Sequence, residues 1–282
     1  MPGKPDWAFQ HLKVTDGQLG CHRTGGSGPA LVLSHGLTDN GLCWFRLAEA
    51  LAGDFDVIML DARGHGQSSA IDDPSTHDPA RDIAEALDAL NLEAPIVMGH
   101  SVGGRATADF AGTWPGRASR VVLEDPIFID PMDPAVRERR QERFRQQVAA
   151  FSAQSEAEIL AAGRLTNPGW HEDDFPAWAE AKRLVDPEAS PFYAHPWQET
   201  VARIDVPVLL IRGEPGYGGV VSPDIAAEAR ALNPLIESVE IPGAGHNIRR
   251  ENFTDYLTAV RGFLLAAPEV MKRPPQDEPP AS

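Results

Sequence analysis

The sequence has few cysteines, a shortage of basic residues and no long apolar run. Its two cysteines, Cys21 and Cys43, cannot build a disulfide framework and lack the spacing of a zinc site, so we expect reduced structural thiols and no metal. No stretch approaches about 18 apolar residues, which predicts no transmembrane helix. Lys and Arg number 25 against 41 Asp and Glu, a net charge of −16 that repels phosphate backbones and anionic lipids. Nucleic acids and membranes are therefore not expected as partners.

The two ends of the chain carry little patterned sequence. The first residues show no basic segment followed by an apolar one, so no secretory signal is predicted and a cytoplasmic location is expected. Residues 268–282 are polar, rich in proline and without periodicity, which predicts a disordered tail. No surface pattern marks a self-complementary patch, so the sequence predicts no oligomeric state.

Short apolar runs alternate with longer amphipathic segments along most of the chain. This alternation is typical of parallel strands covered by helices, and it predicts a doubly wound α/β core made of residues 1–126 and 205–267. Strands are expected at 30–34, 56–60, 95–98, 120–123, 208–211 and 238–241, and helices at 44–51, 81–90, 101–114, 224–232 and 252–265.

Residues 127–204 interrupt the alternation and are expected to form an all-helical insertion. Residues 133–151 are dense in Arg and Glu, which favours a solvated helix with i,i+3 and i,i+4 charge pairs over an anion-binding face. Aromatic residues follow, and about half of them are expected to line a ligand cavity while the others pack the insertion. The candidate substrate-binding residues are Trp170, Trp178, Phe192, Tyr193 and Trp197.

The segment Gly99-His-Ser-Val-Gly103 stands directly between a predicted strand and a predicted helix. A serine on such a sharp turn is held in a strained backbone conformation, and small flanking residues let the neighbouring chain approach. The turn lies at the carboxyl end of a strand, where open α/β sheets bind ligands. We therefore predict that Ser101 is a nucleophile, the alternative being a glycine-rich turn that only permits close helix packing.

A serine hydroxyl needs an adjacent base, which is most often histidine. His246 stands in a glycine-containing loop after the last predicted strand and is the expected base, although a histidine there could instead cap the final helix. His35 follows the first core strand, where it is expected to bend the loop so that a backbone N–H points at the site. The amides of Leu37 and Val102 are the predicted oxyanion hole.

Four motifs in this order and spacing resemble the α/β-hydrolase fold family: His35-Gly36, residues 61–68 (Asp-Ala-Arg-Gly-His-Gly-Gln-Ser), residues 99–103 and residues 243–246. The resemblance covers roughly residues 10 to 266. It implies a mostly parallel eight-stranded sheet, a helical cap after the sixth strand, a Ser-acid-His order and no cofactor. The serine nucleophile argues against the aspartate-using haloalkane dehalogenases and epoxide hydrolases, and the cap looks like that of esterases and lactonases.

The acid of the triad is where the sequence departs from the family pattern, because Gly216 occupies the position at which an aspartate is common. Asp125, which follows the sixth strand, is the first candidate, Glu214 the second and Glu124 the third. Successive strand residues point to opposite faces, so Glu124 and Asp125 cannot both serve.

These residues predict a serine hydrolase that cleaves a carboxylic ester or lactone of a mainly apolar small molecule through an acyl-enzyme. Two alternatives remain open. The same machinery could cleave an amide or an activated carbon–carbon bond, and the fold could be a ligand receptor without catalysis.

Overall fold

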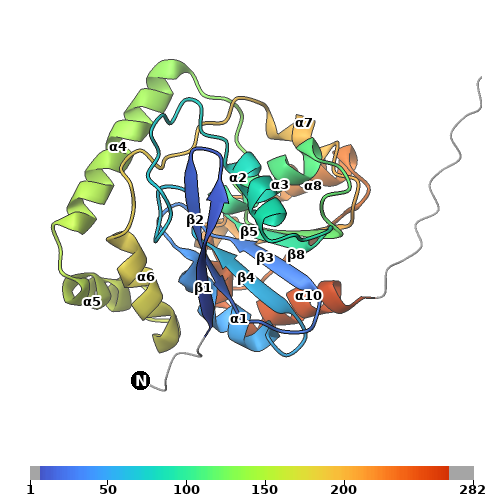
Figure 1. Ribbon diagram of the computed structural model, residues 1–282, viewed down its shortest axis with the longest axis horizontal. Helices are drawn as coiled ribbons and strands as arrows, with labels where there is room; N and C mark the ends of the chain where they lie inside the picture. The colour runs from blue at the N-terminus through green and yellow to red at the C-terminus, as the bar shows by residue number, and fades with distance from the viewer. Residues whose placement is uncertain (1–6, 267–282) are drawn as a thin grey trace, which may run out of the picture.

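The computed structural model describes residues 7–266, so the predicted tail at 268–282 lies outside the described residues (Figure 1). Eight strands form one sheet in the order β1-β2-β4-β3-β5-β6-β7-β8. β1 pairs antiparallel with β2 and β2 with β4, whereas the other neighbours are parallel. The expected eight-stranded, mostly parallel sheet is therefore confirmed. The strands are β1 Ala8–Val14, β2 Gly17–Arg23, β3 Ala30–Ser34, β4 Asp56–Leu60, β5 Ile96–His100, β6 Arg120–Glu124, β7 Val208–Arg212 and β8 Ile236–Glu240.

Helices cover both faces of the sheet because the central strands are apolar on both sides. In β3, Val32 faces one core cluster with α2, α3, α7 and α8, whereas Leu31 and Leu33 face a second cluster with α1 and α10. Within residues 7–266 no helix combines the length and apolar character needed to cross a bilayer. The core helices are α1 Phe45–Leu51, α2 Pro79–Ala89, α3 Val102–Thr113, α8 Pro223–Leu232, α9 Ile248–Glu251 and α10 Phe253–Leu265.

The segment between β6 and β7, which we call the helical insertion, contains α4 Pro134–Ser152, α5 Glu156–Thr166, α6 Phe175–Lys182 and α7 Trp197–Val201. Helices α4 to α6 lie together on one side of the molecule, whereas α7 lies beside α3 and α8 (Figure 1). Only Phe144 and Val148 of α4 are buried, as expected of a solvated helix. The side chain of Asp133 caps its first turn, and Ser155 and Glu158 form a capping box that begins α5.

Candidate active site

Ser101 occupies the turn between β5 and α3, with φ 58° and ψ −119°. A non-glycine residue at positive φ is strained, and two glycines make this turn possible. A Cβ added to Gly99 would lie 2.2 Å from the carbonyl oxygen of Gly103, and one added to Gly103 would lie 2.4 Å from the carbonyl oxygen of His35. Both glycines are therefore required by close backbone approach, as the sequence predicted.

His246 lies in the loop between β8 and α9, where its ring joins the serine to an acid. Its Nε2 is 2.9 Å from Ser101 Oγ, and its Nδ1 is 2.7 Å from Asp125 Oδ2. Asp125 is fully buried directly after β6, and its carboxylate also accepts the amide N–H groups of Val220 and Val221 at 2.9 and 3.0 Å. The structure therefore brings Ser101, His246 and Asp125 into one chain of hydrogen bonds.

The other two candidate carboxylates have different partners, and neither bonds His246 in the described part of the chain. Glu124 accepts from the Tyr256 hydroxyl at 2.9 Å and from Arg249 Nη1 at 3.2 Å, and burial raises the pKa of its carboxyl. Glu214 accepts from the amide of Gly243 at 2.6 Å. Glu124 is the last residue of β6, whereas Asp125 follows the strand with φ 40°, and the two carboxylates have different partners.

The loop after β3 is held by two histidines. His35 Nδ1–H donates to the carbonyl of Gly36 at 2.8 Å, and its Nε2 accepts from the amide of Ala62 at 2.9 Å. His65 Nε2–H donates to the carbonyl of Leu37. Since the C=O and N–H of a trans peptide point in opposite directions, fixing the Gly36 carbonyl also fixes the direction of the Leu37 N–H. His35 thus has the loop-bending contacts that the sequence predicted.

The amides of Leu37 and Val102 have no hydrogen-bond acceptor within residues 7–266. Val102 is the first residue of α3, so its N–H is one of those that a helix start leaves unpaired. A Cβ added to Gly36 would lie 3.5 Å from Ser101 Cβ, which places the loop against the serine. Two unpaired donors beside a serine can stabilise negative charge that develops on a carbonyl oxygen.

Two of the five aromatic candidates line a cavity of about 540 Å³ beside α3. Phe192 and Tyr193 form part of its wall, which also includes Val102 and Gly103 but not Ser101. The guanidinium carbon of Arg105 lies 4.7 Å from the centre of the Tyr193 ring.

The other three aromatic candidates pack against rings and do not line this cavity. Trp170 meets Trp178 edge to face with ring centres 5.9 Å apart, inside the insertion. Trp197, the first residue of α7, stacks on Phe128 in the core with ring centres 4.5 Å apart. These three tryptophans, expected to contact substrate, pack against other rings and lie outside the wall of this cavity.

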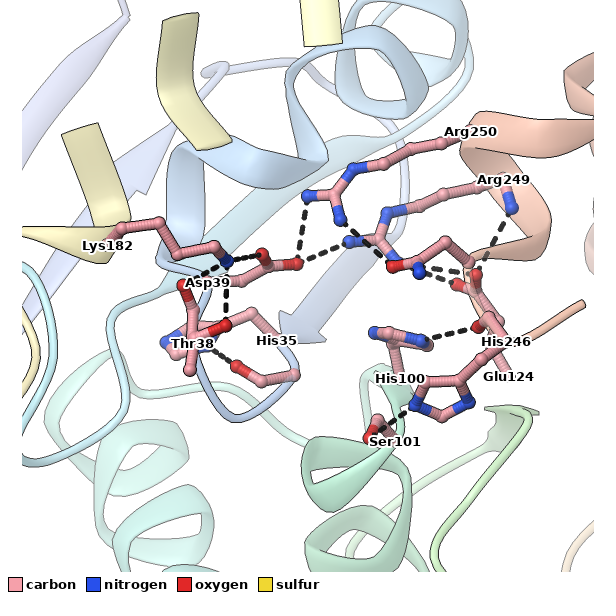
Figure 2. A network of polar contacts seen from close by, with 12 residues as sticks. His35, Thr38, Asp39, His100, Ser101, Glu124, Lys182, His246, Arg249 and Arg250 are labelled. Atoms are coloured by element: carbon pink, nitrogen blue, oxygen red, sulfur yellow. Dashed lines mark hydrogen bonds and ion pairs between the residues drawn. The ribbon is translucent and has the colours of Figure 1, made fainter. Parts of the chain in front are cut away.

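A buried charge cluster, absent from the sequence predictions, lies next to the serine and histidine (Figure 2). It comprises Asp39, Lys182, Arg249 and Arg250, with Asp39 as the shared acceptor. The one signal in the sequence is the pair of arginines that follows His246 by three and four positions. The positions of Asp39 and Lys182 carry no motif.

Within residues 7–266 no group of three or more His, Cys, Asp or Glu side chains is arranged to hold a metal ion. Cys21 and Cys43 are both free and buried, and burial raises the pKa of each thiol to about 12. They are therefore structural thiols, as expected, and neither is a thiolate nucleophile near neutral pH.

A family model described as "alpha/beta hydrolase fold" matches residues 29–252. N-formylmaleamate deformylase from Pseudomonas putida is 29% identical over 252 residues, which covers 86% of this chain and 91% of the relative. The 3-oxoadipate enol-lactonase 1 of Acinetobacter baylyi is 30% identical over 200 residues, or 66% and 70% of the two chains.

A third relative and a solved structure have similar names. The 2-(acetamidomethylene)succinate hydrolase of Mesorhizobium japonicum is 29% identical over 261 residues, which covers 86% of this chain and 91% of the relative. A crystal structure of E-2-(acetamidomethylene)succinate hydrolase superposes with a TM-score of 0.76 and 25% identity, covering 92% of this chain and all of that one. By sequence and by structure, the chain belongs to the α/β-hydrolase fold family, and it is a hydrolase.

Proposed function

We propose that the protein is a serine hydrolase that cleaves a carboxylic ester or lactone of a mainly apolar small molecule. The observation that supports this most is the chain of hydrogen bonds from Ser101 through His246 to Asp125. In this proposal residues 1–126 and 205–267 form the catalytic core, and residues 127–204 form the cap that shapes the substrate site.

In this proposal the hydrogen bond with Asp125 selects the tautomer of His246. An ionised carboxylate only accepts hydrogen bonds, so His246 Nδ1 carries the proton and Nε2 keeps a lone pair for the hydroxyl of Ser101. The amides of Val220 and Val221 hold Asp125 in place as that acceptor. The acid therefore orients the ring and stabilises the imidazolium without taking its proton.

In the proposed reaction Ser101 Oγ bonds to the substrate carbonyl carbon while its proton moves to His246 Nε2. The carbonyl electron pair becomes an oxyanion that the N–H groups of Leu37 and Val102 stabilise. The bond to the leaving alkoxide then breaks, and His246 protonates the alkoxide. Water, activated by the same imidazole, attacks the acyl-enzyme and releases the carboxylic acid and Ser101.

An amide is the second candidate substrate, because two relatives of high coverage have names that specify such chemistry. One is a deformylase of N-formylmaleamate and the other a hydrolase of 2-(acetamidomethylene)succinate. For an amide the steps above are unchanged except that His246 protonates a departing nitrogen. The ester or lactone proposal instead draws on relatives such as the esterase YbfF of Escherichia coli and the enol-lactonase.

The test is a substrate panel assayed with the wild-type protein and with Ser101→Ala. We expect hydrolysis of p-nitrophenyl esters or of a lactone, and a fall of at least about 1,000-fold in turnover for Ser101→Ala, the scale expected for one member of a catalytic unit. Retention of more than about a tenth of the activity would reject Ser101 as the nucleophile. Turnover of a formamide with inert esters would favour the amide, and turnover of a dienone, followed by ultraviolet absorbance, would favour carbon–carbon cleavage.

A further inference from the structure

Four charged side chains are buried together behind the Ser101–His246 pair. Asp39 Oδ2 accepts from Nη2 of both Arg249 and Arg250 at 2.9 Å, and its Oδ1 lies 3.4 Å from Lys182 Nζ. None of the four residues is more than 5% exposed. Burial acts to raise the pKa of Asp39, but the cations of Arg250, Lys182 and Arg249 outweigh it and hold that pKa well below its usual range.

The four residues come from three segments that are distant in the sequence (Figure 2). Asp39 belongs to the loop after β3 that carries the Leu37 amide. Arg249 and Arg250 belong to α9, directly after the His246 loop. Lys182 is the last residue of α6 in the helical insertion. The cluster therefore connects the proposed oxyanion donor, the proposed base and the insertion.

His100 fills the space between the first two of these segments. Its Nε2–H donates to the carbonyl of His246 at 2.9 Å, and its Nδ1 lies 2.8 Å from where a Cβ on Gly36 would be. Burial lowers the pKa of His100 well below its usual value, so the ring is neutral. A shift of the loop after β3 would therefore press directly on the residue that supports the His246 backbone.

Three successive carbonyls of the loop each accept a hydrogen bond. The Gly36 carbonyl accepts from the Asp39 amide at 3.1 Å as well as from the ring of His35, and the ring of His65 donates to the next carbonyl. Lys182 Nζ donates to the carbonyl and to the hydroxyl of Thr38, both at 2.7 Å. Of these donors, Lys182 alone comes from the insertion.

Fold stability is a weak explanation for such a cluster. Removing charges from water costs several kcal/mol per ion, and replacing a buried ion pair by apolar residues is often neutral or stabilising. The cluster instead supplies positive charge near the site, because three cations, Lys182, Arg249 and Arg250, face two carboxylates, Asp39 and Glu124. An excess of positive charge in a buried region favours a developing oxyanion.

We propose that Lys182 is a positioning residue for the oxyanion hole. Its bonds to Thr38 and Asp39 hold the loop after β3 so that the Leu37 N–H points to the position of the oxyanion before substrate binds. Because Lys182 belongs to the helical insertion, the direction of this N–H then depends on the position of the insertion. Substrates that displace α6 would then lose transition-state stabilisation as well as contacts. This inference rests on the proposed serine hydrolase function.

The test compares Lys182→Met with Lys13→Met, which changes an exposed lysine of β1. Hydrolysis of p-nitrophenyl acetate is measured together with inhibition by a trifluoromethyl ketone. Ser101 Oγ adds to the ketone carbon, its proton moves to His246, and the carbonyl becomes an oxyanion that needs the same donors. We expect Lys182→Met to lower kcat by a factor of about 10 to 100 and to lower the affinity for the ketone inhibitor by a similar factor, because a misplaced donor stabilises the oxyanion poorly. KM should change less than about threefold.

Three outcomes of this experiment are distinct. Unchanged kcat and ketone affinity in a folded Lys182→Met protein, with only a lower melting temperature, would show that Lys182 is merely structural and would overturn the inference. If Lys182→Met does not fold, Lys182→Arg replaces it. The guanidinium is larger than the buried ammonium and cannot occupy its position without moving the loop after β3, so the same loss of kcat is expected, with KM again changed less than about threefold. Absence of hydrolysis in the wild type as well would reject the proposed function, and the inference with it.

Discussion

Ser101 has a backbone conformation that glycine adopts more readily than any other residue. Ser101→Gly should therefore be more stable than Ser101→Ala by about 1 kcal/mol, the reverse of the usual order of these residues in helices. Urea unfolding of the two inactive variants measures this difference. Equal stabilities, or a more stable alanine variant, would show that the turn stores no strain at this position.

Asp125 is the residue whose role the geometry makes easiest to isolate. Asp125→Asn keeps the shape but presents an amide to His246 Nδ1, which favours the wrong tautomer, so we expect kcat to fall by about 1,000- to 10,000-fold. Glu214→Gln is the matched control, because the Glu214 carboxylate accepts from the loop amide of Gly243 and, within residues 7–266, does not bond His246; its kcat should stay within about threefold. An active Asp125→Asn protein together with an inactive Glu214→Gln protein would show that Glu214, and not Asp125, is the acid of the triad.

Some of the individual residues of the site could be predicted from the sequence. The pattern around Ser101 and the glycine loop before His246 identify two groups that the structure places 2.9 Å apart. Three carboxylates remained candidates because loop geometry, which brings Val220 and Val221 to Asp125, is not encoded in a local pattern. Lys182 could not be found, since its partner Asp39 is 143 positions away.

Among the elements, the apolar central strands were predictable because both their faces are buried. The β1–β2 hairpin was not predicted from the residues, since the family resemblance implied only the number of strands. Its first strand, Ala8–Val14, buries only Leu12 and Val14, so it shows neither a continuous apolar run nor a full alternation. The helical character of the insertion was predictable, but the direction of its aromatic side chains was not, because packing and ligand binding use the same residues.

Arg105 of α3 connects the core to both ends of the helical insertion. Its guanidinium donates to the carbonyls of Ile129 and His195 at 3.1 and 2.7 Å and pairs with Asp109 at 2.9 Å. Arg105→Met would leave Asp109 and two carbonyls without this partner, so we expect the free energy of unfolding to fall by about 3 to 5 kcal/mol. Arg143→Met, on the exposed face of α4, should change it by less than about 0.5 kcal/mol.

Urea unfolding of Arg105→Met, Arg143→Met and the wild type measures these changes in the free energy of unfolding. Similar losses in both variants would mean that Arg105 does not tie the insertion to the core. A large loss in Arg105→Met alone would show that it does.

For the whole molecule, buried histidines should make stability depend on pH. Burial lowers the pKa of His35 to about 4 and also lowers that of His65 and His100. Between about pH 4 and 6.5 the unfolded chain then binds more protons than the folded one, so stability rises with pH in this window. Each such histidine adds up to about 1.4 kcal/mol per pH unit, whereas Glu124 and Asp109, whose pKa values burial raises, act in the opposite direction.

Urea unfolding at about pH 7, 6 and 5 measures this slope. The exposed His195 provides the control, and His195→Gln should leave the slope unchanged. Stability that is flat or increases toward pH 5 would contradict this prediction, because the buried histidines would then not outweigh Glu124 and Asp109.

The central claim is that Ser101 is the group that attacks the substrate, and covalent labelling tests it most directly. The wild-type protein is incubated with a fluorophosphonate, its residual hydrolysis is followed, and the modified peptide is identified by mass spectrometry. We predict one phosphonyl group per chain, attached to Ser101, with hydrolysis lost in proportion to labelling, and no labelling of His246→Gln on the same timescale. Undiminished hydrolysis, or a label on another side chain, would contradict the account.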